Sequence, residues 1–227
     1  MPIEVTWLGH ATWSLRIGEL TVLIDPFLDG SPTATVKADK VAADFILVSH
    51  GHEDHVADAA KIAVRTGATV VSNFEICQWL GKQGVNKTEP MNLGGSIAAP
   101  FGRIKSTLAW HSSTMPDGAA GGNPGGFLLS VGKQNLYFAC DTALFSDMKL
   151  IGAAGLDLAV LPIGDRFTMG PEDAVKAVEL LEPKQVIPSH YNTWPPIVQD
   201  AAAFAKRVRT ETAAVPIILE PGGTVMI

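Results

Sequence analysis

Six short apolar runs in this chain each end in a residue that can bind a metal ion. The runs are rich in the β-branched and aromatic residues of strands, and they read VTWLGH, TVLIDP, FILVSH, STLAWH, LYFACD and QVIPSH. Their metal-capable residues are His10, Asp25, His50, His111, Asp141 and His190. Layered α/β folds build their binding sites at strand ends. The pattern therefore predicts an α/β fold with a metal site where its strands end.

The stretch ILVSHGHEDH, residues 46–55, holds four candidate ligands in one loop. In extended backbone, residues two apart point to the same side, so His50 and His52 can bind one ion. Asp54 and His55 lie past the bend and face elsewhere, so one loop can serve two ions. With these residues included, all six histidines of the chain lie at or beside a strand end. This arrangement favours ligands over isolated core histidines.

Strands and helices alternate in two similar halves. In the first half we expect strands at 3–9, 12–17, 20–26, 44–50 and 68–72, and helices at 57–66 and 74–83. In the second half we expect strands at 103–110, 126–131, 134–140, 157–163 and 184–189, and helices at 171–182 and 198–212. The helix at 171–182 is well marked, because Pro171 suits its first position and Pro183 stops it. This pattern is compatible with two sheets that pack face to face with helices outside. We expect them to form one domain, residues 1–227.

The composition excludes several classes of protein. Of 227 residues, 47% are hydrophobic and 18% are charged, as in a globular domain. The net charge of −6 argues against a broad nucleic-acid surface. No apolar run reaches the roughly 20 residues of a membrane span, and no secretory signal is visible. Cys77 and Cys140 are too few for a disulfide framework, so we expect a cytoplasmic protein. We also expect a small-molecule substrate. A homo-oligomer is compatible with the sequence.

The pattern H-x-H-x-D-H after a strand resembles the signature of the metallo-β-lactamase superfamily. The resemblance extends to a subfamily of small metal-dependent hydrolases related to the ascorbate-6-phosphate lactonase. The segments that carry it are WLGHAT, IDPFL, SHGHEDH, GGNPGGF, PIGDRFTMGPEDA and PSHYNTWP. They span almost the whole chain, so the resemblance implies an α/β fold of the αββα four-layer sandwich type and no large additional domain.

The resemblance also implies a site with two divalent metal ions. One ion would be held by His50, His52 and His111. The second would be held by Asp54, His55 and His190, and Asp141 would bridge the two. This mixed histidine and carboxylate shell suits zinc first and manganese second, and iron and nickel are also compatible.

Three further residues lie beside the predicted ligands. Asp25 is expected either to accept the second ring N–H of a ligating histidine or to be a turn aspartate before Pro26. His10 is expected to polarise a substrate oxygen or to be structural. Cys140 is not expected to be a ligand, because alternation along a strand would turn it to the core if Asp141 faces the metals.

The expected reaction is hydrolysis by a metal-bound hydroxide, with Asp54 or Asp141 orienting the water or moving its proton. An ester, lactone or phosphodiester of a small anionic substrate fits best. Asp165, Arg166 and Thr168 can supply a substrate pocket, where the arginine would bind the anionic group, or Asp165 can form a structural ion pair with a neighbouring base. Asn192, with Tyr191 and Trp194, can wall the pocket.

Other readings stay open. One is an iron-dependent redox role, which occurs in the same superfamily. The intact second-ion pattern favours hydrolysis over this role. RNA processing and a non-catalytic role are less favoured, because the chain is acidic and the ligand set is intact. The Gly-rich stretch at 117–126 is either a flexible surface connection or a mobile lid.

Overall fold

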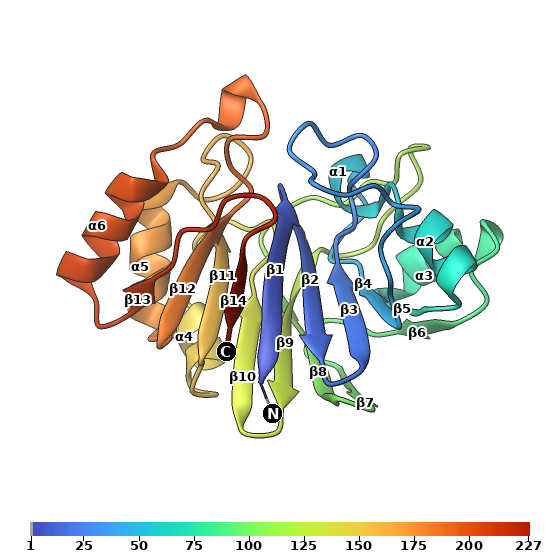
Figure 1. Cartoon of the computed structure of the whole chain (residues 1–227), viewed down its shortest axis with the longest axis horizontal. Coiled ribbons are helices and arrows are strands. Elements are labelled where there is room, and N and C mark those ends of the chain that lie inside the picture. The colour runs from blue at the N-terminus through green and yellow to red at the C-terminus, as the bar shows by residue number, and fades with distance from the viewer. Residues whose placement is uncertain (1) are drawn as a thin grey trace. The chain divides into compact units, whose positions relative to one another are not determined.

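The computed structural model describes residues 2–227 and divides into two compact units (Figure 1). The first unit contains the chain up to Gly95 together with Ser112–Pro124 and Glu220–Ile227. The second unit contains Ser96–His111 and Gly125–Leu219. Each unit is built on a seven-stranded sheet of its own. The organisation as one domain over residues 1–227 stays a prediction.

The sheet of the first unit has the strand order β14-β1-β2-β3-β4-β5-β6. Its strands are β1 (Ile3–Gly9), β2 (Thr12–Ile17), β3 (Leu20–Ile24), β4 (Phe45–Leu47), β5 (Thr69–Ser72), β6 (Thr88–Pro90) and β14 (Thr224–Met226). Pairing is antiparallel from β14 to β3 and parallel from β3 to β6. Because β1 and β3 are both antiparallel to β2, strands β1, β3 and β4 run in one direction. The segments that follow them therefore leave from the same edge of the sheet.

The sheet of the second unit has the order β13-β12-β11-β10-β9-β8-β7. Its strands are β7 (Ser96–Ala99), β8 (Gly102–Leu108), β9 (Gly125–Val131), β10 (Gln134–Phe138), β11 (Leu158–Pro162), β12 (Gln185–Ser189) and β13 (Val215–Pro216). Pairing is antiparallel from β7 to β10 and parallel from β10 to β13. Strands β8, β10, β11 and β12 therefore also end at one edge.

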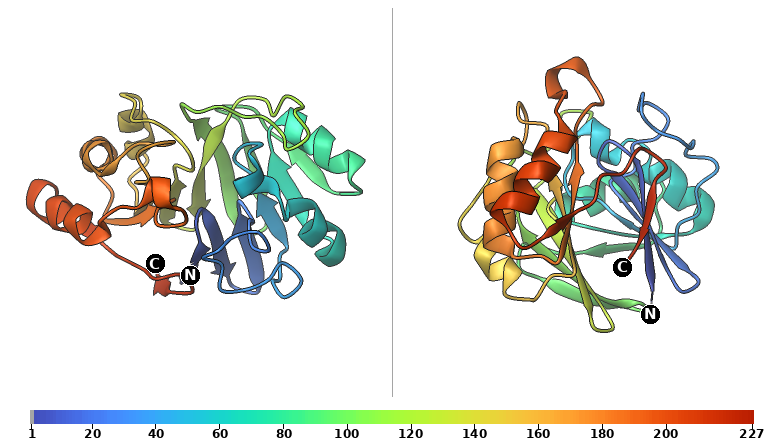
Figure 2. Two further views of the ribbon diagram at one scale, coloured as in Figure 1. Left: turned by 90° about the horizontal axis from the view of Figure 1, so that it is seen from above. Right: turned by 60° about the vertical axis from the view of Figure 1, so that its left-hand side comes forward.

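Helices pack on each sheet. The first unit has α1 (Glu53–Val56), α2 (Ala59–Thr66) and α3 (Phe74–Lys82), and the second has α4 (Met148–Gly152), α5 (Pro171–Leu181), the 3-10 helix η1 (Pro195–Ile197) and α6 (Ala201–Glu211). In the second unit, α5 lies beside α6, and these helices contact β11 and β13 respectively (Figure 2). Within residues 2–227, no helix combines the length and the hydropathy that a membrane span requires.

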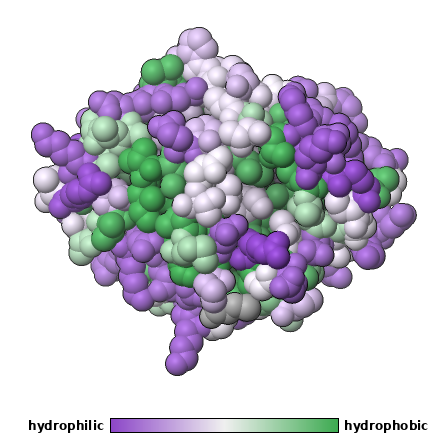
Figure 3. Space-filling view, in the orientation of Figure 1, coloured by the Kyte–Doolittle hydropathy of each residue, from purple (hydrophilic) through white to green (hydrophobic). Residues whose placement is uncertain are grey.

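Each helix buries one apolar face. In the first unit, Ile62 of α2 and Leu80 of α3 join a core cluster with Ile46 of β4 and Val70 of β5. In the second unit, Val175, Val178 and Leu181 of α5 are buried on one face. Large hydrophobic side chains that remain exposed are spread over several elements, and the face in Figure 3 shows them as separate patches among hydrophilic residues.

Several strands are shorter than the sequence predicts. The strand expected at 20–26 ends at Ile24, because Asp25 has φ 46° and cannot continue the ladder. The strands expected at 44–50, 103–110 and 134–140 end at Leu47, Leu108 and Phe138. The helix expected at 57–66 begins only at Ala59, after the separate α1. The helix expected at 198–212 is confirmed as the shorter α6, Ala201–Glu211. The helix expected at 171–182 ends one residue early at Leu181, because the next residue, Glu182, is left-handed.

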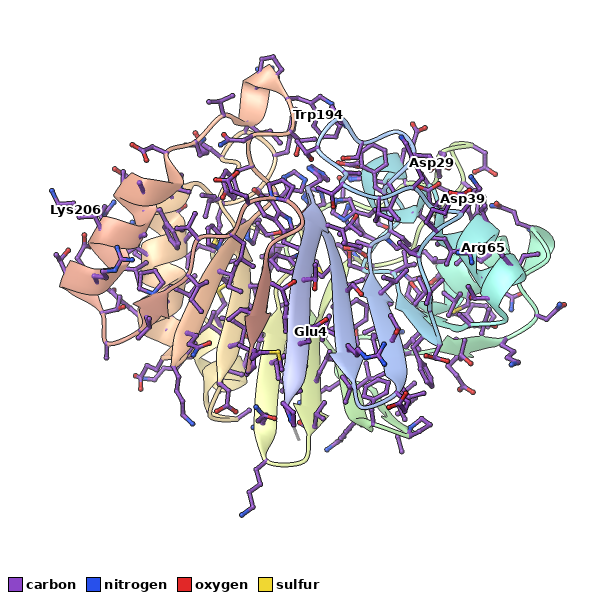
Figure 4. The ribbon with its side chains drawn as sticks, in the orientation of Figure 1. Glu4, Asp29, Asp39, Arg65, Trp194 and Lys206 are labelled. Carbon is purple, nitrogen blue, oxygen red and sulfur yellow. The ribbon has the colours of Figure 1, made fainter. Side chains whose placement is uncertain are left out.

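The long segment between β3 and β4, residues 25–44, is fastened to α2 in the first unit. Buried Asp58 accepts hydrogen bonds from the backbone N–H groups of Leu28, at 2.7 Å, and Asp29, at 3.0 Å. Lys61 donates to the Asp29 carboxylate, and this hydrogen bond lowers the pKa of Asp29. Arg65 donates to the carbonyl of Ala38 at 2.9 Å, and Figure 4 shows Asp29 and Arg65 on this side of the unit. The segment that follows Asp25 is therefore held in place.

Candidate metal centre

The metal-capable residues of the first unit come from one edge of its sheet. His10 follows β1, Asp25 follows β3, and the loop with His50 and His52 follows β4. Because these three strands run in one direction, their carboxyl ends meet. Asp54 and His55 lie on α1, for which His52 is the N-cap residue. The bend inferred in the H-x-H-x-D-H motif is therefore the start of a helix.

Asp25 is the centre of a buried hydrogen-bond network. Its Oδ1 accepts the backbone N–H of Ser49 at 2.7 Å, and its Oδ2 lies 2.6 Å from Ser49 Oγ and 2.9 Å from His55 Nδ1. Thr12 Oγ1 donates to the Asp25 carbonyl at 2.7 Å and so fixes its backbone. Since a carboxylate only accepts, His55 donates from Nδ1, and Nε2 is the ring nitrogen that can bind a metal.

Ser49 extends this network to His50. The serine hydroxyl has one hydrogen, which it donates to Asp25, so its oxygen accepts from His50 Nδ1 at 2.9 Å. The lone pair of His50 then lies on Nε2, which is 3.0 Å from His52 Nδ1. Two nitrogens bound to one tetrahedral zinc ion at about 2.0–2.1 Å would be roughly 3.3 Å apart. The donor pair therefore fits a shared ion.

A second group in this unit surrounds Asp54. Its Oδ2 lies 3.1 Å from His10 Nε2 and 3.8 Å from His55 Nε2. Candidate ligand atoms of these three residues all lie within 4.8 Å of one another. His10 and His55 are fully buried, whereas the side chain of Asp54 is 28% exposed. Asp54 is thus the member of the group that solvent can reach.

In the second unit, one carboxylate oxygen contacts two histidines. Asp141 Oδ2 lies 3.1 Å from His190 Nε2 and 3.6 Å from His111 Nε2. Asp141 and His190 are almost fully buried, and His111 is 12% exposed. Thr142, the next residue after Asp141, accepts the N–H of Trp110 at 2.9 Å and so ties the end of β8 to the end of β10. This unit therefore gathers three donors from three strands.

Left-handed backbone marks the candidate residues. Seven described residues other than glycine have positive φ, and six of them are predicted site residues or their neighbours: His10, Asp25, Cys140, Asp165, His190 and Asn192. Such a conformation costs of order 1–3 kcal/mol per residue. At His10, Asp25 and His190 this conformation directly follows the last strand residue and so ends the ladder there.

The predicted substrate residues lie on loops of the second unit. Asp165 and Arg166 are exposed, and the Arg166 guanidinium lies 5.7 Å from the centre of the Phe167 ring. Thr168 is half-buried, and its N–H donates to the Asp165 carbonyl at 3.1 Å. The Asn192 amide oxygen is used within its own loop, where it accepts the N–H of Gln199 at 2.8 Å. The loop with Trp194 projects beyond the strand ends (Figure 4).

The expectation that Cys140 faces the core is wrong. The residue is partly exposed and has φ 52°, because β10 ends at Phe138 and strand alternation no longer holds at 140 and 141. Sequence reasoning also missed Ser49, Thr12 and Thr142, whose hydroxyl groups link the candidate segments. A hydroxyl residue directly before His50 and directly after Asp141 was the available signal.

Comparisons with known proteins identify the family. A model described as the β-lactamase superfamily domain matches residues 4–190. A UPF0173 metal-dependent hydrolase of Thermus thermophilus is 52% identical over 97% of both chains. Igni18, a metallo hydrolase from Ignicoccus hospitalis, has a TM-score of 0.91 and 34% identity and covers 100% of this chain and 99% of its own. CmlA, a diiron β-hydroxylase from Streptomyces venezuelae, has a TM-score of 0.75 at 16% identity and covers 100% of this chain and 53% of its own, which shows a shared fold alone.

The expected fold class is confirmed by these matches, since each unit is a mixed sheet with helices and the chain aligns with the solved hydrolase over its full length. The chain therefore belongs to the β-lactamase superfamily domain family and has the metallo-β-lactamase fold.

Proposed function

We propose that this protein is a hydrolase that depends on two divalent metal ions. The proposed ligands are His50, His52 and His111 for one ion, Asp54, His55 and His190 for the other, and Asp141 for both. The Thermus relative is named a metal-dependent hydrolase, and Igni18 is described as a metallo hydrolase. We rank zinc first and manganese second, and iron or nickel would fit the same donors.

One observation carries the proposal. The Asp25 and Ser49 network engages the Nδ1 atoms of His50 and His55, so that Nε2 is the ring nitrogen each histidine directs toward the other candidate ligands. Two imidazoles prepared in this way are characteristic of metal ligands, whose second ring nitrogen donates to a carboxylate or hydroxyl. Bound divalent ions would supply Lewis acidity and lower the pKa of a coordinated water to about 7.

The chain's own residues then have separate tasks. Asp54 is partly exposed and lies within hydrogen-bond reach of His10, so it can orient a water and hold its proton. His10 is buried and keeps the Asp54 carboxylate in one position. Asp141 holds the imidazoles of His111 and His190 through one oxygen. None of these roles needs a serine or cysteine nucleophile.

The proposed substrate is a small ester, lactone or phosphodiester with an anionic group. Arg166 is exposed on the loop after β11, where a guanidinium can bind a carboxylate or phosphate through two hydrogen bonds. Thr168 and Asp165 lie on the same loop. The net charge of −6 leaves nucleic acid unfavoured. We place the protein in the cytoplasm, since its two cysteines do not form a disulfide framework.

The test is metal analysis followed by a substrate panel. Protein purified without added metal should contain close to two divalent ions per chain. It should hydrolyse one or more of bis(p-nitrophenyl) phosphate, aryl esters and lactones, and it should leave RNA intact. Tightly bound iron with oxygen uptake and no hydrolysis would instead support a redox role. The fold does not separate the two, because the diiron β-hydroxylase CmlA shares it.

A further inference from the structure

The segment Ser112–Pro124, which we name the clamp, belongs to the first unit although the strands before and after it belong to the second. We infer that the clamp positions the His50 and His52 pair by holding Gly51, the residue between them. This inference rests on the proposed function, because it assumes that the two histidines bind an ion. Ser113 and Asn73 are the proposed positioning residues.

Ser113 joins the clamp to the H-G-H turn, residues 50–52. The backbone N–H of Gly51 donates to Ser113 Oγ at 3.0 Å, and the Ser113 hydroxyl donates to the Gly121 carbonyl at 2.8 Å. A further bond from the Gly121 N–H to the Ser113 carbonyl, at 3.1 Å, closes the clamp on itself. Because the single hydroxyl hydrogen is used on Gly121, the direction of each bond is fixed.

The clamp is anchored at its other end on α3. The Asn73 side-chain amide donates to the carbonyls of Gly121, at 2.6 Å, and Asn123, at 3.1 Å. The Asn73 amide oxygen caps α3 by accepting the N–H of Ile76 at 2.9 Å. Met115 of the clamp is buried in the core cluster of the first unit. These contacts show a docked segment, which the two readings of the Gly-rich stretch, a flexible connection and a mobile lid, did not foresee.

The clamp lies so close to residues 50–52 that a side chain at position 51 would be crowded. A Cβ on Gly51 would lie 3.2 Å from both the backbone nitrogen of Met115 and the carbonyl carbon of Thr114. Gly121 is similarly close to Ser113, since a Cβ there would lie 3.0 Å from the Ser113 carbonyl carbon. The glycines therefore let two backbones pack against each other, and the turn cannot shift without moving the clamp.

The consequence for the metal site is geometric. His50 is oriented from one side by Ser49 and Asp25. The Gly51 peptide sets the direction in which the chain leaves His50, and with it the place of His52 Nδ1, which is 3.0 Å from His50 Nε2. Ser112, the first residue of the clamp, brings its Oγ to 3.4 Å from His52 Nε2. The clamp thus fixes the second histidine relative to the first.

The experiment titrates metal-free full-length protein with Co²⁺ and follows stoichiometry, affinity and the visible absorption spectrum. In Ser113→Ala, the affinity for one ion should fall about 10- to 100-fold, the range known for residues that support metal ligands. Ser113→Thr keeps the hydroxyl and should restore the affinity. Asn73→Asp keeps the acceptor that caps α3 but removes both hydrogen bonds that Asn73 donates to the clamp. The affinity for the same ion should therefore fall.

A matched control is Trp79→Phe. It removes the bond from Trp79 Nε1 to Asp117 Oδ2, at 2.8 Å, in the exposed part of the clamp, and should leave Co²⁺ binding unchanged. If Ser113→Ala does not fold, Asn73→Asp carries the test. Wild-type affinity in both variants, or an equal loss in Ser113→Thr and Ser113→Ala, would overturn the inference alone. A wild-type chain that binds no Co²⁺ would contradict the proposed function as well.

Discussion

The two sheets of this protein have the same strand plan but use it differently. Strands β1 to β6 of the first unit and β8 to β13 of the second follow one pattern, with three antiparallel strands and then parallel ones. In both, the first strand is followed by a histidine and the third by an aspartate. The histidines are His10 and His111, and the aspartates are Asp25 and Asp141.

The matched aspartates have different surroundings. Asp25 accepts three hydrogen bonds from Ser49 and His55, so its oxygens are used inside the protein. Asp141 directs Oδ2 at the Nε2 atoms of two histidines. Both aspartates follow the third strand of their pattern. Asp25 orients proposed ligands, whereas Asp141 is placed to be a ligand itself. The comparison predicts unequal losses when each is removed.

The largest effect is expected for Asp141→Ala. Loss of a proposed bridging ligand should remove at least one ion per chain and lower kcat/KM by about 10³-fold, since metal stabilisation of the transition state is worth several kcal/mol. Metal analysis and hydrolysis of the best substrate in the panel check both values. The matched control is Cys140→Ala, one residue earlier, which should stay within about twofold of wild type. Similar losses in the two variants would show that the bridging assignment is wrong.

The sequence predicts which segments are strands but not where each strand ends. Apolar runs before His10 and His190 identify strands, and the common direction of those strands then brings their ends together. The number of residues past the ladder is different: His50, His111 and Asp141 each lie three positions after the last strand residue. That interval depends on where neighbouring strands stop pairing, which is a tertiary property.

The hydrogen bonds of the supporting hydroxyl groups were also beyond the sequence. Ser49 stands directly before His50, which was a local signal, but its bond to Asp25 spans 24 residues and the bond of Ser113 to Gly51 spans 62, so no local spacing reveals these contacts. The core position assigned to Cys140 failed for a related reason, because alternation was extended past the last paired residue. The candidate ligands could therefore be predicted from residue chemistry. The hydroxyl groups that orient them could be identified only from the fold.

A smaller effect is expected for Asp25→Asn. One carboxylate oxygen becomes an amino group that donates, so the amide cannot accept all three hydrogen bonds from Ser49 and His55, and a buried donor is left unpaired. The free energy of unfolding should fall by about 1–3 kcal/mol, and metal affinity should fall about 10- to 100-fold. Urea unfolding of the metal-free protein and Co²⁺ competition measure the two separately. Loss of all activity with unchanged stability would instead make Asp25 a ligand and remove the contrast with Asp141.

The smallest effect is expected on the loop after the fourth strand, where the units differ most. In the first unit this loop holds His50 and His52, whereas in the second it holds exposed Arg166. Arg166→Met should raise KM for an anionic substrate about two- to fivefold, because an exposed ion pair is worth at most about 1 kcal/mol, and kcat should not change. The loss should shrink as ionic strength rises toward about 1 M, where the Debye length is roughly 3 Å. An equal rise in KM for a neutral aryl ester would mean that Arg166 acts through its packing on Phe167, and the proposed anionic substrate would lose its support.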